Sequence, residues 1–143
     1  MSKAIALVAE PDHALRHLMR RVLLRSGYDV FEIANALQLE ICLRAIPLLV
    51  APSVFFVLGA KLAAHTAHRI SDAASKRSRL GLPDIQVVLT HEPGGLASAP
   101  RLALSACRAA GVLEKPFDLR ELRMMGLRCG AVPATDGSRN ASA

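Results

Sequence analysis

Carboxylate, hydroxyl and amine side chains follow four separate apolar runs of this sequence. They are Glu10 and Asp12 after the first run, Ser53 after the second, Thr90 at the end of the third and Lys115 after the fourth. Carboxylates can hold a metal ion, and a lysine can neutralise a carboxylate or a phosphoryl group. If the runs are parallel strands of one sheet, the groups that follow them meet at one edge and form one pocket.

The apolar runs predict strands that alternate with helices. The predicted strands cover residues 3–9, 28–33, 48–53, 85–89 and 112–113. The predicted helices start at Asp12 or His13, at 34, at 59, at 100 and at 118, and apolar residues recur in them at helical spacing. This alternation predicts an α/β fold, a single doubly wound (βα)5 domain of the flavodoxin-like type. Its five-stranded parallel sheet would have helices on both faces.

Three helices carry more specific predictions. In the helix at 34–44, we expect Leu37, Ile41 and Leu43 to face the core. The run at 75–79 is interpreted as a charged exit to the surface. In the last helix, Asp118 followed three residues later by a glutamate predicts a capped start.

The first helix has a basic side, made of Arg16, Arg20 and Arg21. The simpler interpretation is a solvated surface. The functional alternative is a docking site for an acidic partner helix. The five histidines are interpreted as surface residues, because no acid or cysteine joins them at the spacing of metal ligands.

Length and composition fit one domain at residues 1–128, with a disordered polar tail at 129–143. Apolar residues make up 52% of the 143 residues, which is enough for a packed core, whereas aromatic residues make up only 3% and offer little for base stacking. The net charge of +6 allows an anionic partner, although charge alone indicates function weakly.

The cysteines and one long apolar segment bear on location. Cys42, Cys107 and Cys129 are widely spaced, which suggests neither a disulfide framework nor a metal site and favours a reducing cytoplasm. The segment at 46–64 approaches the length of a membrane span, but its prolines favour a buried strand that leads into a helix. We therefore expect a cytoplasmic protein with no membrane contact.

Two segments near the ends of the sequence carry a resemblance to a known family. From about Ala4 to Leu127 the chain resembles the receiver domain of bacterial response regulators (CheY-like), and residues 14–30 and 115–122 are the most similar. In that family two adjacent acids after strand one help to hold magnesium, and here they fall on Glu10 and Pro11, with Asp12 just beyond.

The resemblance also assigns the rest of the pocket. The phosphate-accepting aspartate ends strand three in the family, and we place this position at Ser53. The hydroxyl residue that contacts the phosphoryl group matches Thr90, the lysine matches Lys115, which precedes a cis proline in the family, and the aromatic switch residue falls on Val112. The sequence is thus similar to a pseudo-receiver that lacks the phosphoacceptor aspartate.

The substitutions have chemical consequences. A serine hydroxyl is a poor nucleophile without a nearby base, so we expect no phosphorylation at this position. Too few carboxylates remain for a convincing magnesium site, and no other cofactor is expected. Lys115 is expected to pair with Glu10 or Asp12 instead.

These expectations lead to a functional hypothesis. The chain is expected to be a stand-alone receiver-like signalling protein of a two-component or phosphorelay system, without enzymatic activity, that acts by protein–protein contact. The partner would be a histidine kinase, a phosphotransfer protein, another regulator or a second copy in a homodimer. The expected partner face spans about 100–127 and includes Arg101, Arg108, Arg120 and Arg123. The alternative is a nucleic-acid-associated basic regulator, whose binding would depend strongly on salt.

Overall fold

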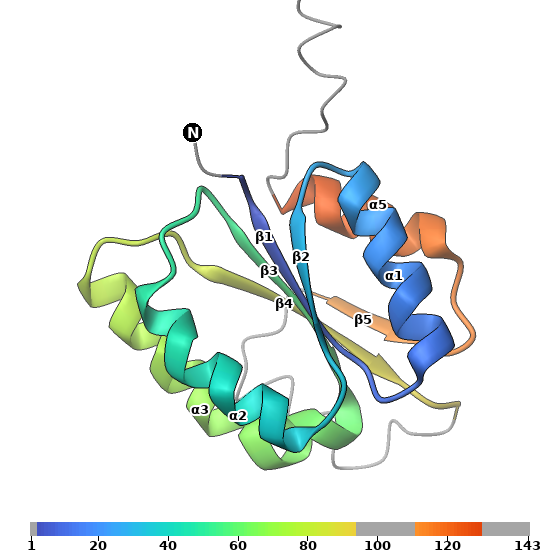
Figure 1. The fold of residues 1–143 in the computed structure, drawn as a ribbon, viewed down its shortest axis with the longest axis horizontal. Coiled ribbons are helices and arrows are strands. Elements are labelled where there is room, and N and C mark those ends of the chain that lie inside the picture. Colours follow the sequence, from blue (N-terminus) through green and yellow to red (C-terminus); the bar gives the residue numbers. More distant parts are fainter. Residues whose placement is uncertain (1–2, 94–110, 130–143) are drawn as a thin grey trace, which may run out of the picture.

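The computed structural model describes residues 3–93 and 111–129, except the side chains of residues 64 and 65 (Figure 1). The strands are β1 (Ile5–Ala9), β2 (Asp29–Ile33), β3 (Val54–Gly59), β4 (Ile85–His91) and β5 (Gly111–Glu114). The helices are α1 (His13–Arg25), α2 (Ala36–Ala45), the short 3-10 helix η1 (Ile46–Leu48), α3 (Ala60–Arg79) and α5 (Leu119–Arg128). The helix predicted at 100–110 and the tail predicted beyond 129 lie outside the described residues.

The five strands form one parallel sheet in the order β2-β1-β3-β4-β5, which confirms the predicted fold class. Figure 1 shows α1 and α5 on one face of the sheet and α2 and α3 on the other. Each face has its own apolar core, and the two cores use alternate residues of the central strand. Phe55 of β3 packs toward α1 and α5, whereas Phe56 packs toward α2 and α3. Because helices cover both faces of the sheet, residues on both sides of the strands are buried, which explains why the strand sequences are continuous apolar runs.

Side-chain caps fix where three helices begin. Asp12 accepts a hydrogen bond from the backbone N–H of Leu15 at 3.1 Å, and Asp118 accepts one from the N–H of Arg120 at 2.8 Å. Asn35 caps α2 through the N–H of Gln38 at 2.9 Å. The predicted starts at Asp12 and Asp118 are confirmed, and both lie at the carboxyl edge of the sheet, where they set the loops that follow β1 and β5.

The third strand was placed wrongly from the sequence. The structure has the end of η1 and an irregular segment over the whole of the predicted strand at 48–53, and β3 starts only at Val54. Pro52 supplies the physical reason, because proline has no N–H to donate and is excluded from the middle of a sheet. Since β3 lies between β1 and β4, its strand has to start after this proline.

The prediction for α2 was also wrong in part. Leu43 is buried as expected, but Leu37 and Ile41 are 72% and 64% exposed, and Leu39 faces the core in their place. The helix therefore carries apolar side chains on both its inner and its outer side.

The charged segment at the end of α3 contains a buried residue, contrary to prediction. Arg77 has no exposed surface, and its guanidinium donates to the carbonyls of Ile46 at 2.9 Å, Leu49 at 2.6 Å and Pro83 at 2.9 Å. Burial lowers the pKa of Arg77, an effect that the nearby Asp84 carboxylate opposes. Arg77 thus joins the segment before β3 to the turn before β4.

No helix within 3–93 or 111–129 has both the length and the apolar character needed to cross a membrane.

Candidate functional site

The carboxyl edge of the sheet brings together three of the residues singled out in the sequence. The register pairs Ala9 of β1 with Leu58 of β3, which places Glu10 just beyond the end of β1 and level with the last residue of β3. Thr90 lies near the end of β4, and the backbone N–H of Lys115 donates to the carbonyl of His91 at 2.7 Å. The peptide bond between Lys115 and Pro116 is cis, as the resemblance implies.

An ion pair between Glu10 and Lys115 dominates this edge. Glu10 Oε1 lies 2.5 Å from Lys115 Nζ, and Glu10 Oε2 accepts from the backbone N–H of Asp12 at 2.9 Å. The Glu10 residue is only 1% exposed, so its charge depends on these partners. Lys115 Nζ also lies 3.3 Å from Glu92 Oε1. The expected pairing of Lys115 with an acid after β1 is confirmed for Glu10.

This ion pair predicts a specific pH dependence. Burial by itself lowers the pKa of Lys115, but the hydrogen bonds and charges of Glu10 and then Glu92 outweigh it and raise that pKa above 10.5. A raised pKa stabilises the fold fully below the unfolded-state pKa, and this contribution is lost as the pH rises through the folded-state pKa. In urea unfolding, the wild-type protein should have a higher free energy of unfolding than Lys115→Met at lower pH. This difference should shrink above about pH 10.5. If the difference in free energy of unfolding between the two proteins stays constant from pH 8 to 12, this prediction is wrong.

Ser53 does not belong to this pocket. It precedes β3, and its carbonyl accepts from the N–H of Ile5 at 3.0 Å, at the amino end of the sheet. A six-residue strand, Val54–Gly59, separates Ser53 from the edge that holds Glu10 and Thr90. The assignment of the strand-three position to Ser53 is therefore wrong, because it rested on the misplaced strand.

Gly59 is the residue that ends β3. Its register partner is Thr90, and a Cβ atom built on Gly59 would lie 3.9 Å from Thr90 Oγ1 and 3.9 Å from Pro11 Cδ. These are ordinary contact distances, and the backbone (φ −64°, ψ 135°) is open to any residue. A side chain at position 59 would thus enter the space between Thr90 and the loop after β1. Sequence reasoning missed Gly59 because glycine carries no reactive group.

Within the described part of the chain, the hydroxyl of Thr90 faces this space without a hydrogen-bond partner. Thr90 is 1% exposed, and among the residues that the structure describes no group bonds its Oγ1. Buried hydroxyls are normally paired. The unpaired Oγ1 therefore marks the place where a side chain at position 59 would contribute a partner.

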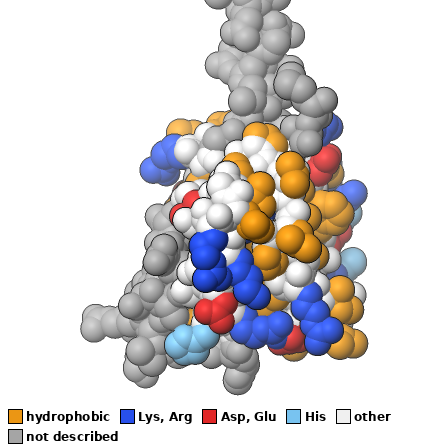
Figure 2. Space-filling view, turned by 90° about the vertical axis from the view of Figure 1, so that its left-hand side faces the viewer, with side chains coloured by type: hydrophobic (Ala, Val, Ile, Leu, Met, Phe, Trp, Pro, Cys, Tyr) orange, Lys and Arg blue, Asp and Glu red, His pale blue; other side chains and the backbone are white. Residues whose placement is uncertain are grey.

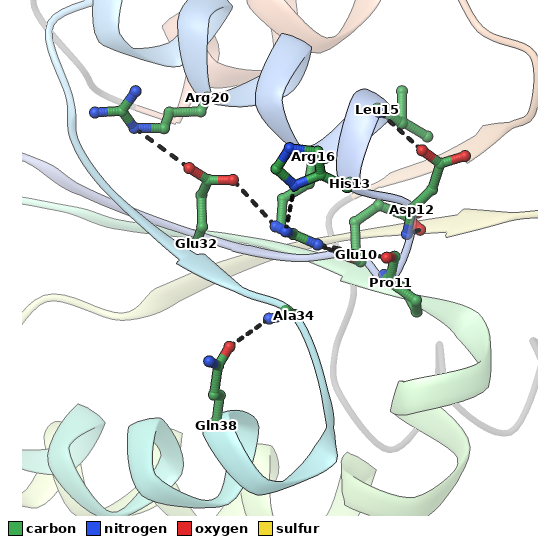
Figure 3. A network of polar contacts seen from close by, with 10 residues as sticks. All are labelled: Glu10, Pro11, Asp12, His13, Leu15, Arg16, Arg20, Glu32, Ala34 and Gln38. Atoms are coloured by element: carbon green, nitrogen blue, oxygen red, sulfur yellow. Dashed lines mark hydrogen bonds and ion pairs between the residues drawn. The ribbon is translucent and has the colours of Figure 1, made fainter.

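Arg16 organises the loop that carries Glu10 (Figure 3). Its Nη1 donates to the Glu10 carbonyl at 2.8 Å, its Nε pairs with Glu32 Oε1 at 3.0 Å, and its Nη2 lies 3.0 Å from His13 Nδ1. Glu32 also lies 3.6 Å from Arg20 Nε. The side chain of Arg16 thus fixes the main chain at Glu10 and ties it to β2.

The interpretation of Arg16 as part of a solvated basic face is wrong, since the residue is only 8% exposed. Arg16 lies three residues before Met19 and seven before Leu23, and both are fully buried. This helical spacing is the signal that would have placed Arg16 on the inner side of α1. Arg21 is exposed, as predicted.

The remaining predicted residues lie away from the ion pair. Val112 is half-buried in β5, opposite Leu89 of β4. Arg120 and Arg123 are exposed on α5, and Arg120 Nη2 pairs with Asp118 Oδ2 at 2.8 Å. Arg101 and Arg108 lie outside the described residues.

Solved structures similar to this chain are response regulators. A receiver protein from Burkholderia phymatum is 19% identical with a TM-score of 0.62, over 92% of this chain and 99% of that one. The chemotaxis protein CheY4 from Vibrio cholerae is 14% identical with a TM-score of 0.63, over 90% of this chain and 99% of that one. A regulator from Burkholderia pseudomallei with a phosphorylated aspartic acid is 16% identical with a TM-score of 0.60, over 99% of this chain and 72% of that one.

At these identities the similarity establishes the fold: the chain has the fold of response regulator receiver domains. No protein-family model and no curated protein sequence matches it.

Proposed function

We propose that the chain is a receiver-like signalling protein that takes no phosphoryl group at the end of β3 and acts by contact with other proteins. One observation carries this proposal: Gly59 ends β3 opposite Thr90 and supplies no side chain. In the receiver resemblance, the phosphate-accepting carboxylate stands at the end of this strand. The substituted position is therefore Gly59 and not Ser53, and glycine leaves no nucleophile there.

The remaining groups at this edge do not replace that nucleophile. An acyl phosphate forms on a carboxylate, and the buried carboxylate at this edge, Glu10, is held by Lys115 Nζ and the Asp12 N–H. Among the described residues no group bonds Thr90 Oγ1, so none of them is in place to remove its proton. This edge therefore supports a binding role better than phosphoryl transfer, and we propose no enzymatic activity.

The residues at this edge also fit magnesium poorly. Magnesium prefers oxygen ligands in near-octahedral geometry. Both oxygens of Glu10 are engaged, and Pro11 and Gly59 have no ligand atom in their side chains. Residues 3–93 and 111–129 contain no cluster of three or more His, Cys, Asp or Glu side chains that could hold a metal ion. The proposal therefore involves no metal.

The proposed partner is a histidine kinase, a phosphotransfer protein, another regulator or a second copy of the chain. The nucleic-acid alternative receives less support, because Arg16 and Arg77 direct their guanidinium groups to internal partners. These two of the eighteen basic residues contribute little to an exposed basic surface. Binding to duplex DNA that weakens steeply between 50 and about 200 mM salt would favour the alternative.

Incubation with acetyl phosphate and magnesium should leave the intact mass of the protein unchanged. The Burkholderia pseudomallei regulator, whose structure contains a phosphorylated aspartic acid, serves as the positive control. Gly59→Asp and Gly59→Asn form a matched pair, because only the first restores a carboxylate beside Thr90. A base-labile phosphoryl adduct on the wild-type chain would overturn the proposal. An adduct on Gly59→Asp alone would support the assignment of the lost position to Gly59.

A further inference from the structure

We propose that the outer side of α2 and η1 is the surface through which two copies of this chain associate. The inference does not depend on the chemistry at Gly59, so each proposal can fail without the other. It starts from the apolar residues of α2, which form two rows on opposite sides of the helix.

The inner row belongs to the core. Leu39, Leu43 and Ile46 follow one another at spacings of four and three and are between 0% and 4% exposed. They pack in the core between the sheet and the helices α2 and α3. This row accounts for the attachment of α2 to the domain.

The outer row has no counterpart in the described structure. Leu37, Ile41, Ala45 and Leu48 follow at spacings of four, four and three, and all are exposed. The three large members are 72%, 64% and 71% exposed. A helix that is apolar on both sides is normally covered on both sides. We therefore expect another chain or segment to cover the outer row.

Two neighbouring residues widen this row into a patch. Val50 follows η1 and is 72% exposed, and Leu80 follows α3 and is 59% exposed. Arg77 bonds the Leu49 carbonyl, which brings the end of α3 against the segment that carries Val50. Figure 2 views the α2 and α3 side of the molecule and shows hydrophobic side chains gathered there, with a group of basic side chains below them.

The size of the patch suits an association surface. At roughly 100 Å² for each large side chain, the five residues expose about 500 Å² of apolar surface. That value lies at the upper end of what monomers leave uncovered. With a polar rim, the patch approaches the roughly 800 Å² per partner of a standard interface.

The chemistry of the patch favours a second copy of this chain. A twofold axis near the middle of the row would align two α2 helices antiparallel and bring Leu37 of one copy toward Leu48 of the other. Arg44 flanks the row and is exposed, whereas Glu40 pairs with Arg69 of α3 in the same copy, so the proposed contact rests on the apolar residues. The row is thus complementary to itself in its apolar groups.

Other occupants fit less well. A helix that lies on a lipid surface is rich in Lys and Arg on its polar side, whereas α2, which carries most of the patch, has a single arginine and no lysine. Lys76 and Arg79 are exposed near Leu80 at the end of α3, so a vesicle-binding test is part of the experiment. Residues 130–143 contain one large apolar residue, Val132, which is too few to cover the patch.

The experiment is sedimentation equilibrium of the full chain over a range of concentrations. Wild type should dimerise, and Ile41→Glu should weaken the dimer by about tenfold or more, because it places a charge at the centre of an apolar contact. Leu18→Glu is the matched control, since it makes the same kind of change on α1, at a residue that is 45% exposed. It should leave the dimer intact.

The inference is wrong if the wild-type chain stays monomeric at all concentrations, or if Leu18→Glu weakens the dimer and Ile41→Glu does not. It is also wrong if no dimer forms and the chain instead binds anionic lipid vesicles in a way that Ile41→Glu abolishes. Far-UV circular dichroism establishes that each variant is folded. Leu37→Glu provides a second variant if Ile41→Glu fails to fold. Because each copy carries a net charge of +6, the wild-type dimer should tighten as salt is added.

Discussion

Replacing Arg77 by alanine should lower the free energy of unfolding by about 3–5 kcal/mol. The guanidinium is fully buried and donates to the carbonyls of Ile46, Leu49 and Pro83. Alanine would leave these three acceptors without a partner and would open a cavity at the end of α3. The loss would fall on the segment before β3 and on the turn before β4, two neighbouring strands of the sheet.

Urea unfolding measures this effect, and Arg79→Ala is the matched control. Arg79 lies on the same last turn of α3 but is exposed, so its removal should change stability by no more than about 0.5 kcal/mol. Arg77→Lys keeps a cation and should fall between the two, because an ammonium cannot reproduce the planar set of donors. Equal stabilities of Arg77→Ala and Arg79→Ala would show that the buried contacts contribute little.

The position of Arg77 could have been found in the sequence. The inner side of α3 carries Ala63, Ala67, Ile70 and Ala73, and Arg77 continues that row by one more turn. The charge of the segment at 75–79 suggests a surface position, whereas the helical spacing of Arg77 indicates the inner side of α3. A buried arginine needs several acceptors, and those come from carbonyls up to 31 residues away in the chain. Its partners therefore could not be read from local sequence.

The fold was predictable because its signals are local. Alternating apolar runs and the caps Asp12 and Asp118 defined most strands and helix starts. The third strand failed because residues 46–58 are almost uniformly apolar, so that hydrophobicity alone gives no register. Pro52 held the missing information, since it cannot lie inside a strand that is paired on both sides.

The sequence predicted part of the candidate site, again because only some of its residues give a local signal. Glu10, Thr90 and Lys115 each follow or end an apolar run and carry a polar group, so the sequence indicates them directly. Gly59 offers no group to notice, and its importance appears only when β3 is paired with β1 and β4. Arg16 was missed because a buried arginine on an amphipathic helix resembles an exposed one in composition.

The second large effect is expected at Lys115. Changing Lys115 to methionine should lower the free energy of unfolding by about 3–5 kcal/mol, because it leaves the Glu10 charge buried without its cation. The side chain of Glu10 is only 2% exposed, so water cannot take the place of the ammonium. The Asp12 N–H would remain as a hydrogen-bond donor, but it carries no compensating charge.

Glu92→Gln is the control that separates this effect from a general loss of charge at the edge. Glu92 also lies near Lys115 Nζ, but its side chain is 60% exposed, and such pairs contribute about 0–1 kcal/mol. In urea unfolding at neutral pH, the free energy of unfolding of Lys115→Met should therefore be far below that of Glu92→Gln. If the double variant Glu10→Gln with Lys115→Met recovers most of the loss, the cost lies in the unpaired carboxylate. If it recovers none, the methylene stem of Lys115 and not its charge supports this edge of the sheet.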